Sequence, residues 1–134
     1  MAQNVAMTTH DDVRRICSRL PGAVEGVDRF GFSVEVKGKF KGFLWTWAER
    51  IDPKKARVVN DSVLAIIVPG LAAKDAINQS DPDKYIIDPH YNGFPAVLVR
   101  LDAVDPEELE DLIVEAWRCK APPALVKQYD TSTQ

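Results

Sequence analysis

Residues 63–68 form the longest apolar run of this chain, Val-Leu-Ala-Ile-Ile-Val. A run this short cannot cross a bilayer as a helix. Its length and its β-branched side chains are typical of a central strand in a sheet. The chain is therefore expected to build a sheet around this segment and to cover it with other elements.

Helical patterns occur near both ends of the chain. Apolar residues at i, i+3, i+4 and i+7 predict a helix over residues 11–20, capped by Thr9. A second helix begins after Asp105, with Pro106 at its first position and Glu108 placed to complete a capping box. Its expected buried face contains Leu109, Leu112, Ile113, Ala116 and Trp117.

Several extended segments lie between these helices. Alternation over residues 32–36 predicts a half-buried strand, and Gly38 permits a turn into a second strand over residues 40–47. That second strand has apolar residues at both odd and even positions, so the pattern does not predict which of its faces is buried. The remaining expected elements are a hairpin of 56–59 and 62–68 about Asn60-Asp61, a short helix over 71–78, an extended segment at 85–87 and a strand over 96–101.

This order of elements predicts an α+β fold, with N- and C-terminal helices packed on one face of a mainly antiparallel sheet. A length of 134 residues suits a single domain over 1–134, with a core over about 11–130 and looser ends. The opposite face of the sheet would then be open to solvent or to a partner.

The sequence favours a cytoplasmic protein without a cofactor. Its first ten residues have neither a basic start nor an apolar segment, so no signal peptide is expected. Cys17 and Cys119 are its only cysteines and are expected to be reduced thiols in or near the core. We find no motif for catalysis, phosphate binding or metal binding. The acidic surface of the last helix is expected to be solvated and not to hold iron, because its carboxylates do not converge.

Charge is divided unevenly along the chain. The formal net charge is −3, yet residues 29–57 contain eight basic and three acidic residues and so carry +5. The same stretch holds Phe40, Phe43, Trp45 and Trp47. Proteins that bind single-stranded nucleic acid combine such cations with aromatic side chains on which bases stack.

The first candidate site is this basic and aromatic region. Because Lys41, Phe43 and Trp45 share one strand parity with Trp47, all four are expected to project from one face. The alternative is that the aromatic residues belong to the core and the lysines form a solvated rim. The candidate nucleic-acid-binding residues are Lys37, Lys39, Lys41, Trp45, Trp47, Lys54, Lys55 and Arg57.

A second candidate is the loop Asp88-Pro89-His90-Tyr91. His90 and Tyr91 could line a small-molecule pocket, where an imidazole titrating near neutrality could transfer protons. The alternative is a turn in which Tyr91 merely packs. No nucleophile or second titrating partner is identifiable, so an enzyme is not the favoured interpretation.

Several segments, by their order and spacing along the chain, resemble the YjbR/MmcQ family over about residues 11–130. The matching segments are Asp12-Val13-Arg14-Arg15, Leu20-Pro21-Gly22 with Glu25, Val36-Lys37-Gly38-Lys39-Phe40, Ser80-Asp81-Pro82, Pro89-His90-Tyr91, Val97-Leu98-Val99-Arg100-Leu101, Val104-Asp105, Glu108-Leu109, Glu115-Ala116-Trp117-Arg118 and Ala121-Pro122. The resemblance implies a CyaY-like (frataxin-like) fold and the description "DNA-binding", with no established catalytic residues. This chain has Pro123 where family members usually carry a lysine.

We therefore expect a non-enzymatic binding module with DNA or another nucleic acid as its partner and no membrane association. Two alternatives stay open: a small-molecule pocket or enzyme site near His90 and Tyr91, and a protein-interaction module that uses the open sheet face. Exposure of Trp45 and Trp47 would separate them, since exposed tryptophans favour a partner surface.

Overall fold

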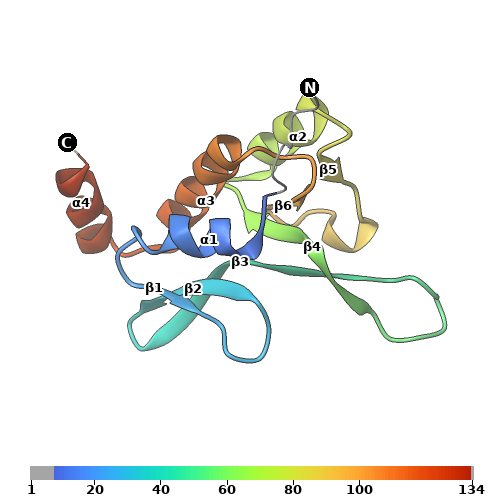
Figure 1. The fold of residues 1–134 in the computed structure, drawn as a ribbon, viewed down its shortest axis with the longest axis horizontal. Coiled ribbons are helices and arrows are strands. Elements are labelled where there is room, and N and C mark those ends of the chain that lie inside the picture. The colour runs from blue at the N-terminus through green and yellow to red at the C-terminus, as the bar shows by residue number, and fades with distance from the viewer. Residues whose placement is uncertain (1–7, 134) are drawn as a thin grey trace, which may run out of the picture.

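The computed structural model describes residues 8–133 as one antiparallel sheet with helices on one face (Figure 1). The strands are β1 (Ala23–Glu25), β2 (Gly31–Val36), β3 (Lys39–Glu49), β4 (Val58–Ile67), β5 (Tyr85–Ile86) and β6 (Ala96–Arg100), in the spatial order β1-β2-β3-β4-β6-β5. The helices are α1 (His10–Cys17), α2 (Leu71–Ser80), α3 (Pro106–Lys120) and α4 (Pro123–Ser132), with a 3-10 turn at Pro89–Tyr91. This is the α+β architecture that the sequence predicts.

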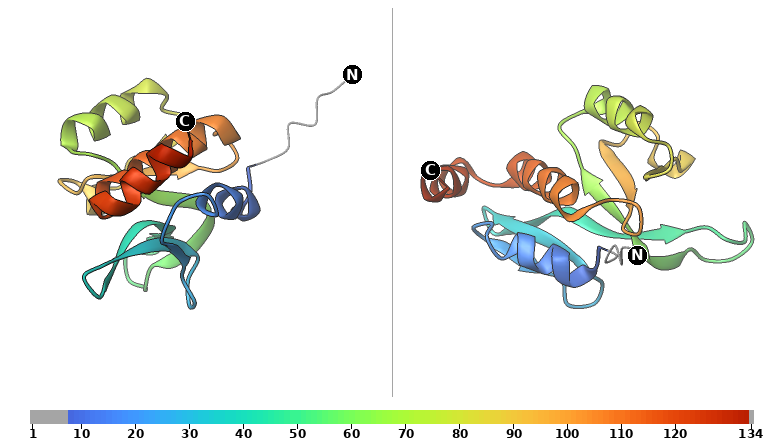
Figure 2. Two further views of the ribbon diagram at one scale, coloured as in Figure 1. Left: turned by 90° about the vertical axis from the view of Figure 1, so that its left-hand side faces the viewer. Right: turned by 45° about the horizontal axis from the view of Figure 1, so that its top comes forward.

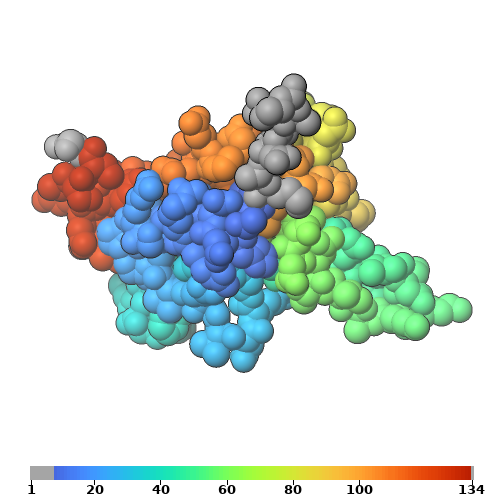
Figure 3. All heavy atoms as spheres, viewed as in Figure 1, coloured from blue at the N-terminus to red at the C-terminus, as the bar shows by residue number. Residues whose placement is uncertain are grey.

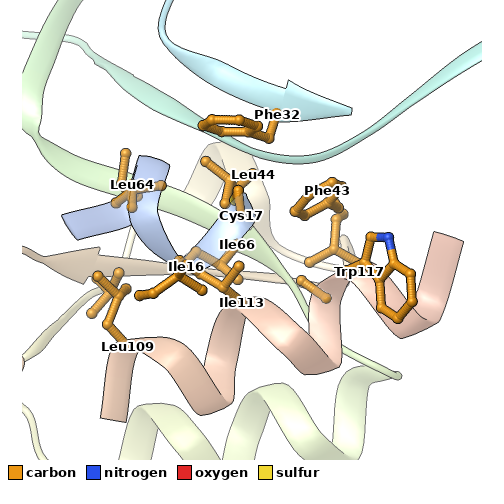
Figure 4. Close-up of a cluster of buried hydrophobic side chains, with 14 of the residues drawn as sticks. Ile16, Cys17, Phe32, Phe43, Leu44, Leu64, Ile66, Leu109, Ile113 and Trp117 are labelled. Carbon is orange, nitrogen blue, oxygen red and sulfur yellow. The ribbon is translucent and has the colours of Figure 1, made fainter. Parts of the chain in front are cut away.

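The main core lies between the sheet and the helices (Figure 4). Ile16 of α1 and Ile113 of α3 pack against the sheet residues Leu44 and Ile66, and all four are almost completely buried. The central position expected for residues 63–68 is confirmed, because β4 lies between β3 and β6. Figure 2 shows the helices on one side of the sheet in two further views.

The predicted helix starts are confirmed, with one correction. Thr9 and Asp12 form a complete capping box at α1. Asp105 caps α3 by accepting the backbone N–H of Glu108 at 2.8 Å. The carboxylate of Glu108, however, accepts from Lys84 Nζ at 2.7 Å, so the capping box predicted here is incomplete. A hydrogen bond from a charged ammonium is stronger than one from a backbone amide, which explains this choice.

The predicted hairpin about Asn60-Asp61 is wrong. Residues 58–67 form the single strand β4, and the turn that precedes it lies at residues 50–57. The register with β3 jumps instead: Thr46 pairs with Leu64 whereas Trp47 pairs with Asn60. The side chain of Asn60 accepts the N–H of Ser62 at 2.9 Å inside this irregularity. Asn60-Asp61 therefore lies at a bulge within β4 and not in a turn between two strands.

The helix α4 was not predicted, and it covers the end of α3. Tyr129 packs edge-on against Trp117 at a centroid distance of 5.3 Å, and Arg118 pairs with Asp130 at 2.7 Å. Cys17 is buried, whereas Cys119 is exposed and not near-core as expected. The expectation about a signal peptide concerns residues that lie partly outside 8–133. Within that range no helix has the combined length and apolarity of a membrane span.

Candidate ligand-binding surface

The sheet face without helices carries a second, smaller apolar cluster. Trp45, Ala65, Leu98 and Ile86 lie side by side across β3, β4, β6 and β5, as the strand register shows. Cross-strand partners project from the same face, so these side chains form one row. Trp47 of β3 and Val63 of β4 complete this second cluster.

Trp45 and Trp47 reach this face because β3 contains a bulge. Phe32 pairs with Leu44 while Ser33 pairs with Gly42, so Phe43 is the extra residue. Phe43 is completely buried in the helix-side core. A bulge breaks the alternation of a strand.

The prediction that Lys41, Phe43, Trp45 and Trp47 share one face is therefore wrong. Lys41 lies opposite Val34, whose side chain is buried beneath the helices. The side chain of Lys41 therefore leaves the backbone on the helix side of the sheet, away from the face that carries Trp45. Only the two tryptophans of this set lie on the helix-free face.

The two candidate sites of the sequence meet in the fold. The indole N–H of Trp45 donates to the Tyr91 hydroxyl at 3.1 Å, and that of Trp47 donates to Asp88 Oδ2 at 3.0 Å. Arg57 donates to the same Asp88 oxygen at 3.1 Å. The loop that contains Pro89–Tyr91 is thus fastened to β3 and to the residue preceding β4.

Asp88 is the centre of these contacts and is only 12% exposed. Burial alone would raise the pKa of its carboxyl group. Hydrogen bonds from the backbone N–H of His90, from Trp47 and from Arg57 outweigh burial and lower the pKa below its ordinary value. Arg57 also donates to the Ala48 carbonyl at 2.7 Å, so its guanidinium is engaged within the protein.

An open hollow of about 300 Å³ lies beside this junction, lined by Trp45, His90, Tyr91 and Phe94. The ring centroids of Trp45 and Phe94 are 6.2 Å apart, and those of Tyr91 and Phe94 are 6.0 Å apart. These separations are typical of interacting aromatic pairs. Trp45 is half-buried, while His90 and Phe94 are exposed.

The predicted lysines lie at two distant tips. Lys37 and Lys39 flank the β2–β3 turn, whereas Lys54 and Lys55 lie in the β3–β4 turn. Figure 3 shows these tips on opposite sides of the molecule. The eleven residues of β3 separate them by roughly 35 Å at ~3.3 Å per residue. They do not form a single patch.

The geometry around His90 suits packing more than proton transfer. Its ring packs against that of Tyr91 in a T-shaped arrangement with centroids 5.9 Å apart, and its backbone N–H donates to Asp88 Oδ1 at 2.9 Å. Within residues 8–133, no group of three His, Cys, Asp or Glu side chains could hold a metal ion.

The two tryptophans whose exposure was to separate the alternatives differ from each other. Trp47 is only 7% exposed and serves the fold, whereas Trp45 is accessible at the hollow. Phe94 was missed as a site residue. An apolar aromatic side chain directly after the loop signal Asn92-Gly93 could have indicated it.

Comparison with known proteins gives relatives without a described activity. The chain is 32% identical over 129 residues to uncharacterised proteins of Mycobacterium bovis and of two strains of Mycobacterium tuberculosis, covering 92% of this chain and 96% of each relative. No family model matches the sequence. A crystal structure of a Deinococcus radiodurans protein with a DUF419 domain superposes with a TM-score of 0.66 at 22% identity, covering 92% of this chain and 89% of that one. At this identity the likeness concerns the fold alone.

Proposed function

We propose a function for this chain from the premise that it belongs to the same family as these uncharacterised mycobacterial proteins. It binds, without chemical conversion, a flat heteroaromatic ring such as a nucleobase. The ring enters the hollow of Trp45, His90, Tyr91 and Phe94. The observation that carries this proposal is the convergence of four ring-bearing side chains from β3 and one loop around an open concavity.

Ring stacking supplies the binding energy in this proposal. Stacking of a base on an aromatic side chain contributes about 1–3 kcal/mol and tolerates every base, because each has a π-face. The fastening of Tyr91 to Trp45 and of Asp88 to Trp47 orders the hollow before the ligand arrives. Ordering in advance lowers the entropic cost of binding.

A single strand of nucleic acid is the proposed source of the ring. Such a strand, laid along β3, would pass over Trp45 between the β2–β3 turn, which carries Lys37, and the β3–β4 turn, which carries Lys54 and Lys55. The resemblance to the YjbR/MmcQ family, commonly described as DNA-binding, supports this choice, and the DUF419 neighbour has the same kind of fold. Duplex DNA fits less well because its bases are stacked and unavailable to the hollow.

The test is a titration of the ¹⁵N-labelled protein with a thymidine oligonucleotide, its duplex and free thymidine, each at two salt concentrations. We expect the oligonucleotide to shift the amides of residues 45 and 88–94 and to bind more weakly at high salt. Trp45→Ala should weaken binding about 5- to 150-fold, the equivalent of one stacked base.

Matched variants separate the two parts of the proposal. The double variant Lys54→Gln/Lys55→Gln should leave thymidine binding unchanged and should reduce the salt slope for the oligonucleotide by about 0.7 per lost phosphate contact. Binding of thymidine but not of the strand would identify a small-molecule site. Absence of shifts in residues 88–94 with every ligand would contradict both readings.

A further inference from the structure

A second cavity lies behind the same loop, between α2 and the edge of the sheet. Its volume is about 260 Å³. The short strand β5 pairs with β6 only at Leu98 and Val99, so Ala96 and Val97 have no strand beside them on that edge. This uncovered stretch of β6 forms one wall of the cavity, and the exposed side chain of Ile87 adds apolar surface to it.

The opposite wall is a polar face of α2. Leu71, Lys74, Asp75 and Asn78 line the cavity and lie at i, i+3, i+4 and i+7, which is one side of a helix. Ala73 and Ile77 pack against the main core instead. Lys74 and Asn78 are partly buried here, whereas Leu71 and Asp75 are exposed, so the cavity is partly open to solvent.

Two of these groups have hydrogen-bonding capacity left over. Lys74 Nζ donates to the carbonyl oxygens of Tyr91 and of Phe94, the latter at 2.7 Å. An ammonium group has three N–H bonds, so one remains for a ligand. The Oδ1 atom of Asn78 is buried and has no partner within residues 8–133. A buried acceptor without a donor costs about 1–3 kcal/mol, which a bound N–H group would relieve.

We propose that this cavity binds a small zwitterionic molecule with an apolar side group, of which an apolar α-amino acid is the simplest example. Its carboxylate meets Lys74, its ammonium group donates to Asn78 beside Asp75, and its side group packs against the exposed apolar side chains of Leu71 and Ile87, which line the same cavity. The volume equals that of about nine water molecules at ~30 Å³ each, which suits an amino acid better than a nucleotide.

The electrostatics of Lys74 agree with an anionic partner. Partial burial lowers the pKa of its ammonium group, and Asp75 offsets only part of this effect. A carboxylate beside Lys74 would restore the interactions that the charged form loses on burial. The cavity and the aromatic hollow share only Tyr91, so this proposal stands without the nucleic-acid proposal.

The test uses L-leucine as the probe and two analogues, 4-methylpentanoate without the ammonium group and 3-methylbutylamine without the carboxylate. In ¹⁵N-labelled full-length protein we expect leucine to shift the amides of residues 74–78 and 96–98, and each analogue to bind at least about tenfold more weakly, one charged hydrogen bond being worth about 1.5–3 kcal/mol. A ligand with a dissociation constant of 1 mM is about nine-tenths bound at roughly 10 mM, which sets the range of the titration.

Asn78→Leu and its exposed neighbour variant Gln79→Leu provide the matched pair. Asn78→Leu removes the unpartnered acceptor, so it should raise the melting temperature while it abolishes the leucine shifts. Gln79→Leu should leave leucine binding intact. The proposal is overturned if no probe shifts residues 74–78 at these concentrations, as for a cavity that holds only water. Leucine binding that survives Asn78→Leu unchanged, or shifts confined to the aromatic hollow, would overturn it equally.

Discussion

The indole N–H of Trp45 donates to the hydroxyl of Tyr91 at 3.1 Å, across 46 positions of sequence. This contact joins a residue of the basic and aromatic region to a residue of the loop, which the sequence presented as separate candidates. A parallel contact between Trp47 and Asp88 lies next to it. On the helix-free face, Trp47 therefore holds Asp88, while Trp45 holds Tyr91 and lines the hollow.

Replacement of Trp47 should cost more stability than replacement of Trp45. Trp47→Phe removes a donor from a nearly buried carboxylate and should lower the free energy of unfolding by about 1.5–3 kcal/mol. Trp45→Phe removes a bond between two neutral groups and should cost about 0.5–1.5 kcal/mol. Urea unfolding of both variants measures the difference. Equal losses would show that Asp88 does not depend on Trp47.

Asp88→Asn should flatten the acid side of the stability profile. The pKa of Asp88 is below its ordinary value of 3.8, so the unfolded chain binds its proton first as the pH falls. The stability that this carboxylate contributes is therefore fully present above about pH 5 and disappears as the pH falls through 3.8 towards the lower pKa of the folded state.

Urea unfolding at several pH values tests this effect. The stability difference between the wild type and Asp88→Asn should shrink as the pH falls through that window. Glu107→Gln, at an exposed acid, is the matched control and should show no comparable change. A difference that stays constant from neutral pH to pH 3 would refute the role assigned to Asp88.

The two cysteines should differ strongly in reactivity. Burial raises the pKa of Cys17 to about 12, and the Cys17 side chain belongs to the main core. Burial also raises the pKa of Cys119, yet Cys119 is exposed. Because the thiolate is the reacting species, a maleimide should label Cys119 in the native protein and Cys17 only after unfolding. Mass spectrometry of the peptides measures both, and native labelling of Cys17 would contradict the placement of α1.

Trp117→Phe should loosen the C-terminal helix. Trp117 is completely buried, donates to the Pro21 carbonyl at 3.0 Å and packs against Tyr129 of α4. The variant leaves a carbonyl without its donor, which costs about 1–3 kcal/mol, and adds a cavity. Hydrogen exchange should show faster opening of residues 123–132. Leu112→Ala, at a partly exposed position of α3, is the control. Unchanged exchange in α4 would exclude the coupling.

The sequence determined those parts of the fold that depend on local chemistry. The caps at Thr9 and Asp105, the apolar face of α3 and the central place of residues 63–68 all follow from spacing and side-chain type. Each of these signals acts over a few residues, within one turn of helix or one strand, and so can be recognised without knowledge of the partner.

Only the tertiary structure decided which faces and loops meet. The bulge at Phe43 placed Lys41 and the two tryptophans on opposite faces, and an irregularity at Asn60-Asp61 in β4 replaced a predicted turn. Both depend on the fit of two strands and not on either strand alone. The hollow likewise needs Trp45 and Tyr91 to converge from distant segments. Strand alternation could be predicted locally, but the register that places it on a face is a property of the assembled sheet.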